Sequence, residues 1–79
     1  MNLEKTRNIA LKLMRQHGLI RYTFKWDRAV RRFGSCNGRT KTLTLSRPMT
    51  QHESNEKRVI NTILHEIAHA LDYKKRGYS

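Results

Sequence analysis

Apolar residues recur with a helical period near the N-terminus. Between Leu3 and about His17 they share one face, while charged residues occupy the other. Asn2 stands at an N-cap position, and Gly18 follows where helices commonly end. The pattern predicts a helix packed on a core. A membrane-surface amphipathic helix is less favoured, because the apolar face has no large aromatic anchor.

From residue 19 onward the period shortens to two residues, as in half-buried strands. In the first such stretch Ile20, Tyr22, Phe24 and Trp26 alternate with polar residues. The candidate strands are "LIRYTFKW" (19–26), "AVRRFGSC" (29–36) and "KTLTLS" (41–46). Asn37-Gly38 between the last two is a hairpin signal, and Pro48 ends the sheet segment.

A long helix is predicted over "NEKRVINTILHEIAHALDYKKR" (55–76), with Ser54 as its N-cap. Its apolar residues surround most of the circumference, so we expect a mostly buried helix with one polar stripe. A helix, three short strands and a second helix predict an α+β fold, formed by one domain over residues 1–79.

This helix carries His65, Glu66 and His69, spaced H-E-x-x-H, with the two histidines on the polar stripe and Glu66 about a quarter turn from His65. At about 100° per residue the two histidines stand roughly 40° apart, so both can reach one ion. Glu66 lies near enough to take a proton from a zinc-activated water without binding the metal. The motif is short enough to occur by chance. Its flanks "ILHEIAHAL" are uncharged, however, and burying these polar groups without a partner is costly, which favours metal binding.

The chain is also strongly basic. Seventeen Lys and Arg against six Asp and Glu give a net charge of +11. Such a domain is drawn to polyanions, most commonly nucleic acid, although generic solubility charge and an acidic protein partner are alternatives. The candidate phosphate contacts are Arg28, Arg31, Arg32, Arg39 and Lys41, with Lys74, Lys75 and Arg76 as further ones.

Cys36 is the single cysteine, so no disulfide can form within a monomer. A lone thiol fits a reducing compartment. The N-terminus lacks the apolar core of a secretory signal, and no run approaches the roughly 18 apolar residues of a membrane span. We therefore expect a monomer in the cytoplasm, nucleoid or nucleus, with no membrane partner.

The stretch from Phe24 onward carries further motifs. "FKWDRAVRRFGSC" is followed by "LTLS" (43–46) and then by "TILHEIAHAL". In this order the segments resemble the SprT-like family of zinc metalloproteases, which includes the Spartan-type proteases that act on proteins crosslinked to DNA. The matching residues of the first segment are Phe24, Trp26, Asp27, Ala29, Arg32, Gly34 and Cys36.

The resemblance implies a minimal zincin fold with Zn²⁺ as cofactor. His65 and His69 would be zinc ligands, Glu66 the general base, and Cys36 a packing residue. An edge strand of the sheet would hold an extended peptide by strand addition.

The family also has a third histidine, about a dozen residues after the second. Here the chain ends at Ser79, ten residues past His69. We therefore expect the third ligand beyond Ser79, in a chain that is either a truncated member or a compact, phage-type one. Asp72 is the internal candidate, whereas His17 and His52 are expected to be ordinary surface residues.

Three functions follow as hypotheses. The first is a zinc endopeptidase that acts on proteins on or near DNA. The second is a non-catalytic, basic DNA- or protein-binding module on a zincin scaffold. The third is a small inhibitor that binds an acidic partner protein.

Overall fold

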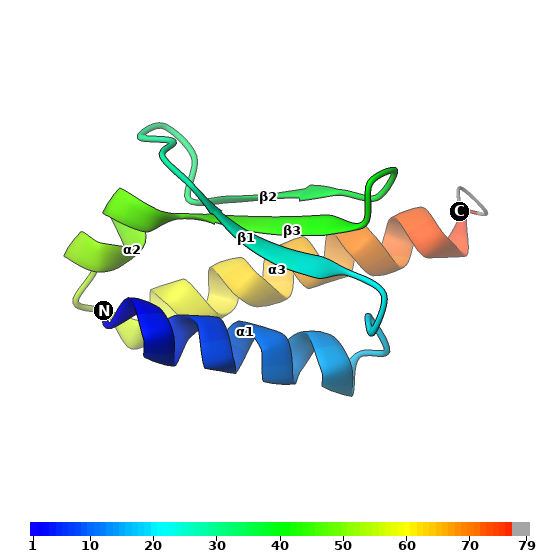
Figure 1. Cartoon of the computed structure of the whole chain (residues 1–79), viewed down its shortest axis with the longest axis horizontal. Coiled ribbons are helices and arrows are strands. Elements are labelled where there is room, and N and C mark those ends of the chain that lie inside the picture. Colours follow the sequence, from blue (N-terminus) through cyan, green and yellow to red (C-terminus); the bar gives the residue numbers. More distant parts are fainter. Residues whose placement is uncertain (77–79) are drawn as a thin grey trace.

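A three-stranded sheet lies over two helices, which both cover the same face (Figure 1). The computed structural model describes residues 1–76, and the elements within them are α1 (Leu3–Gln16), β1 (Thr23–Asp27), β2 (Gly34–Asn37), β3 (Thr42–Ser46), α2 (Arg47–His52) and α3 (Glu56–Lys75). The predicted α+β class is confirmed. None of the helices in this part of the chain is both long and apolar enough for a membrane crossing.

The sheet is mixed, with β3 in the middle. β1 pairs with β3 in parallel, and β2 pairs with β3 in antiparallel fashion. Leu43 stands in register with Phe24 on one side and Cys36 on the other. Because residues in register point to the same face, all three side chains face the helical layer. The opposite face carries mainly threonine, serine and lysine.

The core lies between the sheet and the helices α1 and α3. Its members from the helices are Ala10, Met14, Val59, Ile63, Ile67 and Ala70, and from the sheet and its approach Leu19, Phe24, Leu43 and Leu45. The prediction for α1 is confirmed, including its caps. The Asn2 side chain accepts a hydrogen bond from the Lys5 backbone N–H at 2.9 Å, and Gly18 adopts a left-handed φ of 79° after the last turn.

The predicted first strand began too early. Residues 19–22 form a turn, in which the Leu19 N–H bonds to the Met14 carbonyl at 2.8 Å and the Tyr22 N–H to the Leu19 carbonyl at 3.2 Å. Leu19 is thereby buried, whereas Ile20 is 77% exposed. The alternation holds from Phe24 onward, and its apparent extension to Ile20 was accidental.

The predicted second strand was also too long. Residues 28–33 form a loop whose base is fixed at Ala29: its N–H donates to Asp27 Oδ1 at 3.1 Å, and its carbonyl accepts from the Ser46 hydroxyl at 2.6 Å. Val30, which the pattern assigned to a strand, is 75% exposed. Hydrogen bonds from side chains to the Ala29 backbone therefore take the place of strand pairing in the arginine-rich loop of residues 28–33.

The hairpin between β2 and β3 is confirmed, but Gly38 does not adopt the left-handed conformation expected of a turn glycine. The left-handed residue of the turn is Lys41, with φ 54°, and the Asn37 side chain accepts hydrogen bonds from the N–H groups of Arg39 and Thr40. Gly38 is needed for space, because a Cβ there would lie 2.3 Å from the ring of Tyr73 in α3.

The short helix α2 was missed. Ser46 ends β3 and also caps α2, since its hydroxyl accepts from the Met49 N–H at 3.1 Å. Pro48 in the first turn is typical of a helix start, so the signal was present and was interpreted only as the end of the sheet.

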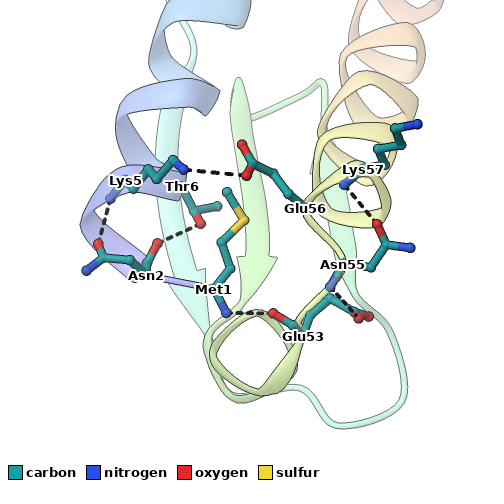
Figure 2. Close-up of polar contacts among 8 residues, drawn as sticks. All are labelled: Met1, Asn2, Lys5, Thr6, Glu53, Asn55, Glu56 and Lys57. Carbon is teal, nitrogen blue, oxygen red and sulfur yellow. Dashed lines mark hydrogen bonds and ion pairs between the residues drawn. The ribbon is translucent and has the colours of Figure 1, made fainter.

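The N-terminus joins α1 to α2 and to the segment that follows α2 (Figure 2). The Met1 ammonium donates to the carbonyls of Thr50 at 2.9 Å and Glu53 at 2.6 Å. The N-cap of α3 is Asn55 rather than Ser54, and its side chain accepts from the Lys57 N–H at 3.1 Å. These contacts fix where α3 begins, and so which of its side chains face the sheet.

Candidate metal and catalytic site

The two histidines of the motif face each other on the exposed side of α3. Their Nε2 atoms are 3.1 Å apart, and the rings are nearly perpendicular, with centroids 4.6 Å apart. Two nitrogens bound tetrahedrally to one zinc at 2.0–2.1 Å lie about 3.3 Å apart. The separation of the two nitrogens is therefore close to that of two ligands of one zinc ion.

Glu66 differs from the histidines in its burial. It is only 7% exposed, whereas both histidines beside it are exposed. Burial, followed by the nearby Glu66 carboxylate, raises the pKa of the Cys36 thiol. Glu66 and Cys36 of β2 also line the same surface hollow. The motif thus combines two exposed imidazoles with one largely buried carboxylate.

A groove follows α3 along β2, formed by two adjoining hollows. One is lined by Phe33, Arg58 and His65, the other by Cys36, His69 and Asp72, and Glu66 and Gly34 line both. Glu66 thus stands at the centre of the groove, with one histidine in each half.

Gly34 allows this close approach of helix and strand. A Cβ at this position would meet the Leu45 side chain at 3.0 Å and the Thr62 methyl group of α3 at 3.1 Å. Most side chains at position 34 would push α3 away from β2 or fill the groove. The glycine of the "FGSC" stretch is therefore explained by packing beside the site.

The outer edge of β2 presents backbone groups alongside the groove. The Ser46 N–H bonds to the Phe33 carbonyl at 2.7 Å, and the same antiparallel register continues through β2. Because inward and outward hydrogen bonding alternate along such a strand, Gly34 and Cys36 direct their N–H and C=O groups away from β3. Within residues 1–76 no other strand pairs with this edge.

Asp72, the internal candidate for a third ligand, lines the same groove as His69. Its carboxylate forms an ion pair with Arg76 at 3.2 Å. No group of three or more His, Cys, Asp and Glu side chains in the described residues is arranged to hold a metal ion. The third ligand expected beyond Ser79 lies outside those residues.

The predicted phosphate contacts fall into two groups at opposite ends of β2 (Figure 1). Arg28, Arg31 and Arg32 belong to the loop that precedes the strand, and Arg39 and Lys41 to the turn that follows it. Arg32 is paired with Asp27 at 3.4 Å. Lys74, Lys75 and Arg76 at the end of α3 lie beside the second group rather than the first.

Other residues of the groove escaped sequence analysis. Arg58 lies 5.9 Å above the Phe33 ring and pairs with Glu53 at 3.3 Å. The Tyr73 ring covers Gly38. The contacts with Phe33 and Gly38 join α3 to segments more than twenty residues earlier, so periodicity gave no signal for them. His17 and His52 are exposed at the ends of α1 and α2 and line neither hollow.

The fold and the motif together define a small α+β domain that carries an H-E-x-x-H helix beside a sheet edge. The model of the SprT-like family matches residues 3–78. The chain belongs to the SprT-like family, as the motif order had indicated. Searches of curated proteins and of solved structures found no significant match.

Proposed function

We propose that this chain is a zinc-dependent endopeptidase with a zincin-like site, which acts on proteins on or near DNA. The main support is the arrangement on α3: two Nε2 atoms 3.1 Å apart, next to a buried carboxylate at the centre of a groove. Membership of the SprT-like family, which has metalloprotease members, is consistent with the proposal.

His65 and His69 would hold the metal in this proposal. The third position would be taken by a group outside residues 1–76, or by Asp72 once released from Arg76. When bound, zinc supplies a Lewis acid that lowers the pKa of water and polarises a peptide carbonyl. Glu66 would take the proton of the attacking water and pass it to the leaving amine. The protein around it excludes bulk water from one side of that carboxylate.

The substrate would lie in the groove as an extended peptide. The outward N–H and C=O groups of Gly34 and Cys36 would pair with its backbone, which gives affinity without strong sequence preference. Because Gly34 carries no side chain, the backbone of a peptide can pass close to Glu66. The net charge of +11 would bring the domain to nucleic acid and to proteins bound there.

Zinc content and proteolysis test the proposal together. Purified protein should hold one zinc by native mass spectrometry, and His65→Ala should lose it. Glu66→Gln should keep the zinc and lower the rate of casein cleavage by about 10²- to 10⁴-fold, the usual contribution of a general base. Undiminished cleavage by Glu66→Gln would refute the role of Glu66. DNA binding without zinc or cleavage would favour the non-catalytic module instead.

A further inference from the structure

A further cavity lies at the end of the molecule where α3 ends, and the motif does not account for it. It is enclosed by the turn between α1 and β1, the turn between β2 and β3, and the last turns of α3, and it has a volume of about 380 Å³. These three segments come from distant parts of the sequence and meet at the same end of the fold (Figure 1).

Besides two glycines and the aliphatic residues Leu19 and Ile20, the lining of this cavity is aromatic and basic. Tyr22 and Tyr73 contribute rings, and Arg21, Lys41 and Lys74 contribute cations. None of the described residues that line it is acidic. Cations with no neutralising carboxylate favour a phosphate, and tyrosine rings offer faces on which a base can stack.

The backbone around the cavity is held in place. Lys41 adopts a left-handed φ of 54°, an uncommon conformation for a lysine that is often associated with functional sites. Its carbonyl accepts a hydrogen bond from the Thr23 N–H at 2.8 Å. The lysine is thus fixed at the base of its side chain, which lowers the entropy lost on binding an anion.

Tyr22 remains a hydrogen-bond donor in this setting. Burial, followed by the nearby groups of Cys36 and Tyr73, raises the pKa of its hydroxyl above the ordinary value of 10.0. The hydroxyl therefore stays protonated at neutral pH.

The cavity shares a wall with the groove of the H-E-x-x-H site. Gly38 and Tyr73 line both the cavity and the hollow that contains Glu66 and His69. A ligand in the cavity would therefore lie directly beside a peptide in the groove.

We propose that this cavity binds one nucleotide unit of single-stranded nucleic acid, with the base against Tyr22 and the phosphate between Lys41 and Lys74. A base within a duplex is stacked on both faces and cannot enter, whereas an unpaired one can. The inference specifies the nucleic-acid partner of the proposed function. Nucleotide binding can be measured directly, so this inference is tested independently of proteolysis.

The test is fluorescence anisotropy with a labelled 12-nucleotide oligothymidylate, over a series of salt concentrations. Lys41→Gln combined with Lys74→Gln should weaken binding about tenfold and reduce the log–log salt slope by about 0.7, the value for one neutralised phosphate of a single strand. The matched control is Arg7→Gln with Arg15→Gln, which removes the same charge from the exposed face of α1. It should change affinity less than about threefold, the general effect of lower charge.

Stacking is tested by Tyr22→Leu, with its fold checked by thermal melting. The loss of one stacked base should weaken binding by about tenfold. Thymidine monophosphate should compete at high concentration, and a duplex of equal length should bind more weakly than the single strand.

If Lys41→Gln/Lys74→Gln and Arg7→Gln/Arg15→Gln weakened oligonucleotide binding equally, the binding would be due to diffuse charge attraction. That result would overturn the proposal. So would equal affinity for duplex and single strand, or unchanged binding by a folded Tyr22→Leu variant. Glu66→Gln should bind the oligonucleotide like the wild type. A failure of proteolysis is thereby separated from a failure of this site.

Discussion

The two faces of α3 differ in what they contact. One face carries Val59, Ile63, Ile67 and Ala70, each at most 1% exposed, and packs against the sheet and α1. The other carries Leu64, His65, Ala68 and His69, all of them exposed. Glu66 lies on the border. One face holds the helix in the fold, while the other presents the residues that carry the proposed chemistry.

The difference shows how a small domain can fix the orientation of exposed ligands. The buried face determines the rotation of α3 about its axis, and therefore the direction of the histidines. Both histidines are exposed and their rings contact each other, so backbone position rather than packing in the core aligns them. Stability and metal binding should consequently respond to different substitutions.

Ile63→Ala should have the largest effect on stability. Ile63 is fully buried, and the loss of its methyl and methylene groups should lower the free energy of unfolding by about 2–5 kcal/mol. Leu64→Ala, one residue along on the exposed face, should cost less than about 1 kcal/mol. Urea unfolding of the two variants measures both; similar losses would contradict the division of the helix into two faces.

Gly38→Ala should have an intermediate effect. The added Cβ would collide with the Tyr73 ring at 2.3 Å, and such overpacking typically costs about 1–3 kcal/mol. The double variant Gly38→Ala/Tyr73→Ala removes the collision and should lose less than the sum of the single changes. A double-mutant cycle by urea unfolding tests this, and strict additivity would argue against the contact.

His65→Ala should barely change stability in the absence of metal. The side chain is exposed on α3, so with a chelator present the free energy of unfolding should change by no more than about 0.5 kcal/mol. With zinc in excess the wild type should gain stability and the variant should not. A large loss in the chelator would mean that the exposed face also supports the fold.

The smallest expected effect concerns Cys36. Burial and the nearby Glu66 raise the pKa of its thiol above the ordinary 9.0. The folded state therefore holds this proton more tightly than the unfolded state. The associated stability is fully present below about pH 9 and is lost as the pH rises through the folded pKa. The pH dependence of iodoacetamide alkylation measures the shift, and Glu66→Gln should reduce it.

Sequence patterns predicted the elements that depend on local rules. Helices α1 and α3, the Asn2 cap and the hairpin follow from periodicity and capping chemistry, and the H-E-x-x-H spacing alone brings the two histidines together. The extent of β2 was mispredicted because the hydrogen bonds of Ala29 come from Asp27 and from Ser46. The cavity beside Tyr22 could not be predicted, since three distant segments form it.

The outer edge of β2 has a consequence for solubility. A strand edge left open for a peptide is equally open to the same edge of a second copy, and such pairing leads to aggregation. β2 has only four residues, and arginine or lysine clusters lie at both of its ends. Two copies approaching edge to edge would bring these like charges together. The same cations that attract nucleic acid therefore protect the open edge from self-association.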